Sequence, residues 1–113
     1  MKIDIPHVVR DLSLSEYAPE MNGAVLKVWV NPTRDCMARF DPALSDDAKL
    51  SAWYSELLSQ SADTETHLSA DELLQVYEAD PALWSFIAAR AWQLIGEHRA
   101  ALEKKQVTPS ATA

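Results

Sequence analysis

The chain has one cysteine, two glycines and no long apolar run, and each scarcity excludes a class of protein. The single cysteine, Cys36, cannot form an internal disulfide, and a lone thiol is typical of a reducing cytoplasm. Two glycines are too few for the Gly-rich loops that hold nucleotide phosphates. No run of about 18 apolar residues is present, so the sequence predicts no membrane span. The N-terminal MKIDIPHVVRD carries acids and a proline, unlike a signal peptide.

Basic residues are scarce in the middle of the chain. Residues 45–80 hold Lys49 against nine acids, a net charge of -8. Five basic and six acidic residues give residues 1–44 a net charge of -1, and four basic and two acidic give residues 81–113 a net of +2. The acidic middle disfavours phosphate backbones, so we expect no nucleic-acid binding. We interpret the acids as solvated helix faces; a steering surface for a basic partner is the alternative.

The first third of the sequence predicts β structure. Apolar residues alternate with charged ones from Ile3 and Ile5 onward, and Asn22-Gly23 is a strong turn signal. Residues 24–30 form the clearest strand, with alternate residues on opposite faces. One face is entirely apolar and is expected to lie in the core, whereas Lys27 and Trp29 share the other face. We therefore expect an antiparallel hairpin or small sheet.

The remainder is predicted to be helical, because helix-start signals recur along it. Three of them place a capping residue before a proline: Asn31-Pro32, Asp41-Pro42 and Asp80-Pro81. Ser45 with two following acids opens another helix, and Ser69 to Glu72 forms a capping box. The expected fold class is α+β, a single globular domain over residues 1–105. It comprises a β unit (1–31) and a helical part (32–105) with helices over about 70–79 and 81–105, before a disordered tail (106–113).

The last helix carries one apolar stripe and two aromatic residues that do not fit it. The stripe, drawn at helical spacing, is Leu83, Trp84, Ile87, Ala88, Ala91, Leu94, Ile95, His98 and Leu102. Phe86 and Trp92 flank the stripe on opposite sides. Either this helix is buried over a wide arc, or these two rings are exposed and can bind another chain. We favour the second interpretation, since so small a domain can hardly surround a helix. The candidate partner-binding residues are therefore Trp29, Phe86 and Trp92, whereas Trp53 and Trp84 are expected in the core.

Candidate catalytic and metal-binding residues are few. Cys36 lies in the first turns of a predicted helix, whose dipole would lower the thiol pKa, but no histidine is placed to assist it. His98 fits better as a partly buried stripe residue. The acid pairs Asp46-Asp47 and Asp71-Glu72 are explained by helix first turns. One cysteine and three scattered histidines give no metal-ligand spacing. We therefore expect a non-enzymatic protein without catalytic, cofactor or metal residues.

Two stretches carry a resemblance to a known family. They are LSEYAPEMNGAVLKVWVNPTRD, residues 14–35, and ADPALWSFIAARAWQLIGEHRAALEKK, residues 79–105. With the order of a small β unit, several helices and a long charged helix, the sequence resembles the tail assembly chaperones of long-tailed bacteriophages and prophages.

The resemblance implies a chaperone in the host bacterial cytoplasm that binds the tape measure protein, helps recruit tail tube subunits and self-associates. It implies no cofactor and maps no invariant functional residue onto this chain. Three alternatives remain open: a structural virion or head–tail component that stays in the particle, an acidic protein-binding inhibitor or DNA mimic, and a small enzyme that rests on Cys36 or His98 alone.

Overall fold

The fold begins with a β hairpin and continues as helices, which confirms the α+β prediction. The computed structural model describes residues 3–41, 43 and 46–111, with side chains as far as residue 104. Its principal elements in chain order are β1 (Val9–Ser13), β2 (Val25–Trp29), α1 (Arg34–Ala38), α2 (Asp47–Leu57), α3 (Ala70–Ala79) and α4 (Pro81–Ala111). Short 3-10 turns lie at η1 (Leu14–Glu16), η2 (Pro19–Met21) and η3 (Thr64–Thr66).

The two strands form an antiparallel sheet in which Val9 pairs with Trp29 and Ser13 with Val25. The predicted turn is present, with Gly23 in the left-handed region at φ 90°. The connection folds back as η1 and η2. The predicted β character of Ile3 and Ile5 is wrong, because both precede β1 in an extended segment and their side chains are about three-quarters exposed.

The hairpin has the two faces that the alternation predicted, with one exception. Leu26, Val28 and Val30 are buried in the core. On the opposite face the Lys27 ammonium forms an ion pair with the Asp11 carboxylate. Trp29 shares that second face but is buried as well, at 4% exposure.

The helix after β2 begins later than predicted. Its N-cap is Thr33, whose Oγ1 accepts a hydrogen bond from the Cys36 amide at 3.1 Å. The Asn31 side chain makes long-range bonds instead: Oδ1 accepts from the Val8 amide at 2.8 Å, and Nδ2 donates to the Pro6 carbonyl at 2.9 Å. Asn31 therefore fastens the N-terminal segment to the end of β2.

The helix predicted at Asp41-Pro42 has no counterpart at the described residues there. Asp41 Oδ1 accepts a hydrogen bond from the Ala43 amide at 2.9 Å, an Asx-type turn, while Pro42 and Ser45 lie outside the described residues. The next helix, α2, begins at Asp47 and is capped by Asp46.

The later helix starts follow the sequence closely. Ser69 and Glu72 form both bonds of the predicted capping box at the start of α3. Asp80 precedes α4, and its Oδ1 accepts from the Leu83 amide at 3.4 Å. The backbone of α4 continues to Ala111, so the predicted helix end near residue 105 is too early and the expected tail begins as helix.

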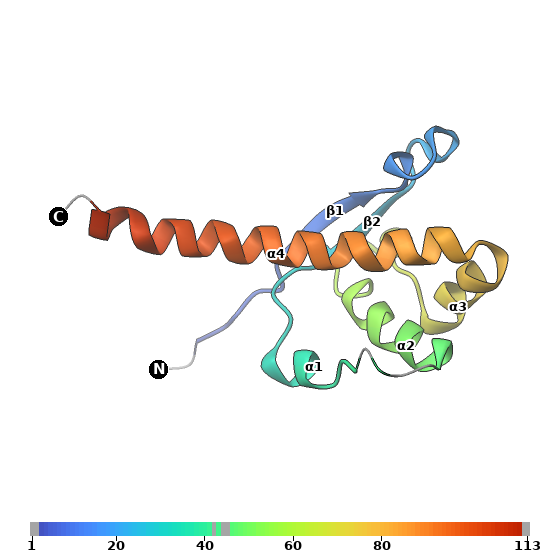
Figure 1. The fold of residues 1–113 in the computed structure, drawn as a ribbon, viewed down its shortest axis with the longest axis horizontal. Helices are drawn as coiled ribbons and strands as arrows, with labels where there is room; N and C mark the ends of the chain where they lie inside the picture. Colours follow the sequence, from blue (N-terminus) through green and yellow to red (C-terminus); the bar gives the residue numbers. More distant parts are fainter. Residues whose placement is uncertain (1–2, 42, 44–45, 112–113) are drawn as a thin grey trace.

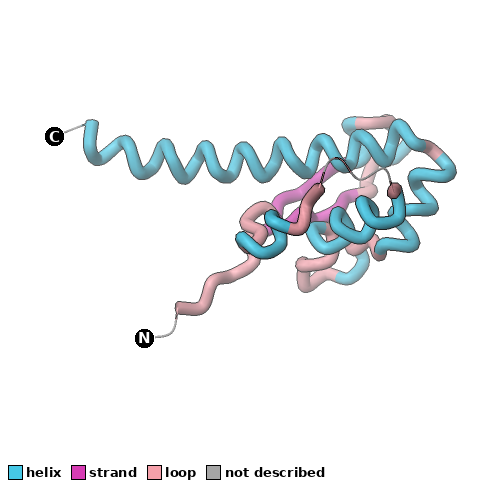
Figure 2. The backbone as a smooth tube through the Cα atoms, turned by 60° about the horizontal axis from the view of Figure 1, so that its bottom comes forward, coloured by secondary structure: helices cyan, strands magenta, loops and turns pink. Residues whose placement is uncertain are grey.

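The shape of the molecule is set by α4, which is much longer than the elements packed on it (Figure 1). The molecule measures 54 × 32 × 28 Å. Figures 1 and 2 both show the first half of α4 lying on the hairpin and on α2–α3, and the second half extending away from them. In the packed half Ile87, Ala91 and Ile95 are at most 2% exposed, as the stripe predicted.

Candidate functional site

Trp29, the first of the predicted contact residues, lies beneath the N-terminal arm (residues 3–7). Its ring packs against the exposed His7 ring at a centroid distance of 4.5 Å. The two bonds of Asn31 to the chain on either side of His7 hold this arrangement. Trp29 Nε1 is buried and has no hydrogen-bond partner among the described residues. Trp29, a predicted partner-contact residue, is therefore covered by its own chain in this structure.

Trp92 is part of an aromatic cluster inside the domain. Its ring stacks on Trp53 at a centroid distance of 5.4 Å and meets Phe40 edge-on at 5.0 Å. Its Nε1 donates a 2.9 Å hydrogen bond to the Tyr54 hydroxyl. Burial raises the pKa of the Tyr54 phenol, and this donation partly opposes the rise. Trp92 is half-buried, and its ring and N–H therefore make their contacts within its own chain.

Phe86, on the other flank of α4, packs against the hairpin connection. Its ring lies 5.6 Å from the Tyr17 ring. The Tyr17 hydroxyl donates a 2.8 Å hydrogen bond to Asp80 Oδ2, and this bond to a carboxylate raises the pKa of Tyr17. Arg90 adds an ion pair to Glu16, with Nε 3.2 Å from Oε2. Both aromatic flanks of α4 are therefore covered by segments of the same chain, the arrangement that the sequence analysis disfavoured.

Of the two tryptophans predicted in the core, Trp53 is confirmed there and Trp84 packs against the core from its edge. Trp53 is 7% exposed and its Nε1 donates to the Cys36 carbonyl at 2.8 Å. Trp84 is half-buried and donates from Nε1 to the fully buried Ser51 hydroxyl at 3.1 Å. The indole N–H groups of Trp53, Trp84 and Trp92 thus each have a hydrogen-bond partner, which offsets the cost of burying them.

Cys36, the candidate nucleophile, is fully buried at the start of α1. Burial raises the pKa of its thiol, so the expected lowering by the helix dipole is wrong. Neither its side chain nor that of His98 forms a hydrogen bond within the described part of the chain. His67, the other histidine of the helical part, has Nε2 2.6 Å from the Ser61 carbonyl oxygen. The structure brings none of these three together in a catalytic arrangement.

The carboxylate pairs lie at helix starts, as the sequence predicted. Asp46 Oδ1 accepts from the amides of Ala48 and Lys49. The bonds between Glu72 and Ser69 hold the pKa of the Glu72 carboxyl below its usual value. Over the described residues, no group of three or more His, Cys, Asp or Glu side chains could hold a metal ion.

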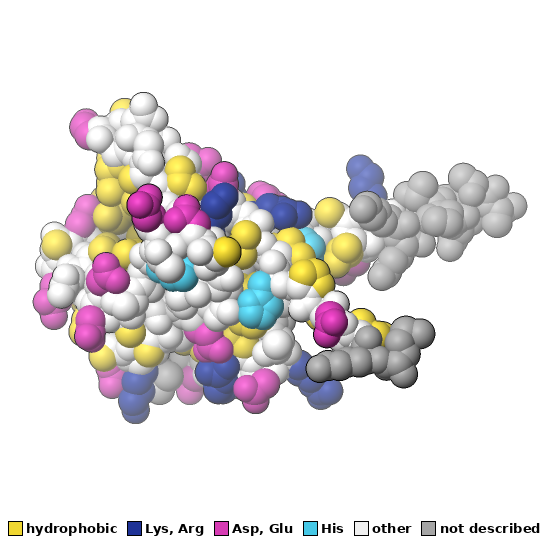
Figure 3. Space-filling view, turned by 180° about the vertical axis from the view of Figure 1, so that it is seen from behind, with side chains coloured by type: hydrophobic (Ala, Val, Ile, Leu, Met, Phe, Trp, Pro, Cys, Tyr) yellow, Lys and Arg dark blue, Asp and Glu magenta, His cyan; other side chains and the backbone are white. Residues whose placement is uncertain are grey.

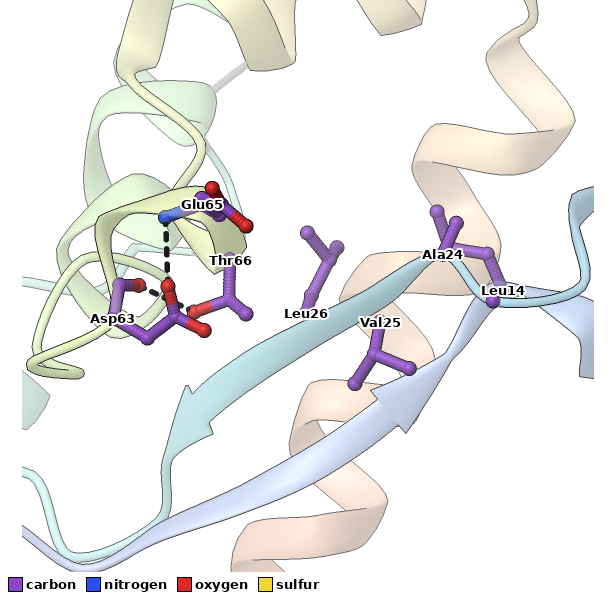
Figure 4. A pocket seen from close by; sticks show the side chains of 8 residues that line it. Leu14, Ala24, Val25, Leu26, Asp63, Glu65 and Thr66 are labelled. Atoms are coloured by element: carbon purple, nitrogen blue, oxygen red, sulfur yellow. Dashed lines mark hydrogen bonds between the residues drawn. The ribbon is translucent and has the colours of Figure 1, made fainter.

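A cavity of about 360 Å³ lies between β2 and η3 (Figure 4). Its lining is Leu14, Gly23, Ala24, Val25, Leu26, Asp63, Glu65 and Thr66. Two of its polar side chains form local hydrogen bonds, since Asp63 accepts from the Glu65 amide at 3.0 Å and the Thr66 hydroxyl donates to the Asp63 carbonyl at 2.7 Å. The cavity presents no nucleophile beside a general base, so it has no catalytic constellation.

The large exposed hydrophobic side chains lie on two separate segments near one end of the molecule. The large hydrophobic side chains that are exposed in the described part of the chain are Ile3, Ile5 and Leu102, at 76%, 75% and 46%. They belong to the N-terminal arm and to the projecting half of α4 (residues 96–111), which leave the globule at the same end in Figures 1 and 2. The described side chains of both segments lie at that end in Figure 3 as well. We call these two segments the projecting end.

The sequence analysis missed this end as a candidate site. It assigned Ile3 and Ile5 to a strand and Leu102 to the buried stripe. One signal was available: the stripe of α4 continues to Leu102, beyond the length that one small domain can cover.

Within the described residues, no helix combines the length and the apolar character that a membrane span requires. Comparison with protein-family models, with curated proteins and with solved structures returns no match for this chain.

Proposed function

We propose that this protein is a non-enzymatic tail assembly chaperone of a long-tailed phage or prophage, which binds the tape measure protein and helps recruit tail tube subunits. The resemblance of residues 14–35 and 79–105 to that family supports the proposal. The observation that carries it is the projecting end, where Leu102 on the helix and Ile3 and Ile5 on the N-terminal arm are exposed outside a domain that covers its own aromatic core.

The chemistry of this end suits a helical client. The projecting half of α4 spans about 24 Å at about 1.5 Å per residue. An amphipathic helix binds another helix through apolar residues at helical spacing, and Leu102 continues the stripe that α4 uses inside the domain. The net charge of -7 keeps a protein with such a surface soluble. A small contact of this kind is also readily reversed, as a coat replaced by tube subunits requires.

We propose other contact residues than the three that periodicity indicated. Phe86 and Trp92 already pack on rings of their own chain, and Trp29 is buried. The proposed contact residues are therefore Ile3, Ile5 and Leu102.

The test is co-expression with the tape measure protein of the same phage, followed by measurement of soluble tape measure protein and its co-purification. Leu102→Asp is expected to lower both. Ala100→Asp is the matched control, because it adds the same charge to the same exposed stretch on the opposite side of the helix.

Unchanged recovery with Leu102→Asp and with Ile3→Asp/Ile5→Asp would contradict the proposed surface. If the wild-type chain neither solubilises nor binds the tape measure protein, the chaperone function is wrong. Stoichiometric amounts in purified particles, measured by mass spectrometry, would favour the structural virion component instead.

A further inference from the structure

The two-stranded sheet leaves the outer edge of β2 without a partner strand. The Leu14 amide donates to the Ala24 carbonyl at 3.0 Å, and this pair continues the register of the two strands. Because hydrogen-bonded and non-bonded pairs alternate along antiparallel strands, the even-numbered residues of β2 bond to β1. The amides and carbonyls of Val25 and Lys27 therefore point to the other edge. Over the described residues these four groups form no hydrogen bond.

The cavity between β2 and η3 lies beside this edge. Ala24, Val25 and Leu26 contribute to its lining from the strand side, and Asp63 and Glu65 contribute from the side of η3 (Figure 4). At about 360 Å³ the cavity has the size of known ligand pockets, which span about 300–1,000 Å³. It can therefore accommodate part of an extended chain. We call this cavity and the adjoining outer edge of β2 the β2 groove.

The β2 groove carries two carboxylates that are not neutralised within the described part of the chain. Asp63 and Glu65 are both exposed, and neither forms an ion pair with any described residue. Asp63 uses Oδ1 to accept from the Glu65 amide at 3.0 Å, and Oδ2 is not used in that bond. The surrounding residues 45–80 have a net charge of -8. An occupant of the groove therefore binds more strongly if it carries a basic side chain.

The outer edge of β1 is protected, in contrast to that of β2. Arg10 Nη1 donates to the Val9 carbonyl at 3.1 Å, so one acceptor of that edge is already occupied. Arg10 and Asp11 are exposed there, and charged side chains commonly protect free strand edges from further pairing. None of the residues that line the cavity belongs to β1. The edge available to a further strand is thus that of β2.

We infer that the β2 groove binds an extended, basic segment of another protein by strand addition. The backbone of the segment pairs with Val25 and Lys27 as a third strand, and a Lys or Arg side chain of the segment lies against Asp63 and Glu65. The unpaired backbone groups call for an occupant with a peptide backbone, and the carboxylates select its charge. The inference goes beyond the proposed function, because the β2 groove shares no residue with the projecting end and requires no tape measure protein.

The test uses the full chain and a fluorescein-labelled peptide, Thr-Val-Thr-Lys-Thr-Val-Thr, with binding read by fluorescence anisotropy. Wild type should bind this peptide, and exchange of its central Lys for Glu should abolish binding. Alternate amides of a strand point to the same edge. N-methylation of one alternate set of peptide amides should therefore weaken binding at least about tenfold, whereas methylation of the other set should leave it nearly unchanged.

A double variant of the chain tests the two carboxylates. Asp63→Asn/Glu65→Gln removes both charges, and asparagine retains the N-cap that Asp63 provides to η3. This variant should bind the peptide about threefold to tenfold more weakly. Asp71→Asn/Glu78→Gln is the matched control, because it removes two exposed acids from α3, and it should bind as wild type does. Circular dichroism should show equal folding of both variants.

Amide hydrogen exchange measured by NMR locates the bound peptide. The amides of Val25 and Lys27 should gain protection, whereas those of Leu26 and Val28, which already bond to β1, should not change. The inference is overturned if wild type does not bind the peptide, or if the Lys and Glu peptides, the two methylated forms or the two double variants bind alike. Protection of Val25 and Lys27 at high chain concentration without peptide would show a second copy in the groove, and would also overturn it.

Discussion

Replacing Trp92 by alanine tests whether its ring stabilises the fold as a core residue or serves as a contact for a partner. The change removes the stacking on Trp53, the edge contact with Phe40 and the hydrogen bond to Tyr54. Loss of a buried tryptophan costs about 3–5 kcal/mol in protein cores. Because Trp92 is only half-buried, we expect about 3 kcal/mol, of which the hydrogen bond accounts for about 1 kcal/mol.

The assays are urea unfolding, which gives the free energy, and thermal unfolding, which gives Tm, both followed by far-ultraviolet circular dichroism. At this size a loss of that magnitude lowers Tm by about 10–15 °C. Trp92→Phe is the control, because it keeps an aromatic ring but removes the indole N–H, and its loss should be clearly smaller. An unchanged unfolding midpoint for Trp92→Ala, together with weakened partner binding, would refute the packing argument and restore Trp92 as a contact residue.

Three further outcomes test the other parts of the structure. Ser69→Ala should cost about 1 kcal/mol in urea unfolding, as loss of an N-cap does, whereas Ser85→Ala, at an exposed position within α4, should cost less. Because the pKa of Glu72 is lowered in the folded state, its contribution to stability is present above pH 4.5 and is lost as the pH falls below that value. The stability difference between wild type and Glu72→Gln should therefore shrink as the pH falls, and a difference that stays constant with pH would contradict this. Cys36 should react with a thiol reagent such as DTNB only after unfolding, because it is fully buried and its pKa is raised; rapid native-state labelling at neutral pH would contradict that placement.

Local signals predicted the parts of the fold that local interactions determine. The bounds of α3 follow from the capping box at Ser69 and from Asp80-Pro81 at the other end. At both ends the hydrogen bonds involved join residues that are three positions apart. The stripe of α4 was likewise predicted, because helical periodicity is a property of the sequence itself.

The wrong predictions concern side chains whose partners are distant in the sequence. Asn31 resembled an N-cap, but its side chain binds Pro6 and Val8, more than twenty residues away, and Thr33 takes the cap. The rings of Phe86 and Trp92 fell outside the stripe of α4. No periodicity could indicate that Tyr17 and Phe40, from two connecting segments, would cover them.

The most direct measurement of the central claim is hydrogen exchange on the chain with and without the tape measure protein that we propose it binds. The account predicts added amide protection at the projecting end, in peptides covering residues 3–7 and 97–104, and little change around Trp53 and Trp92. Added protection over the aromatic cluster, or none anywhere in the chain, would contradict it.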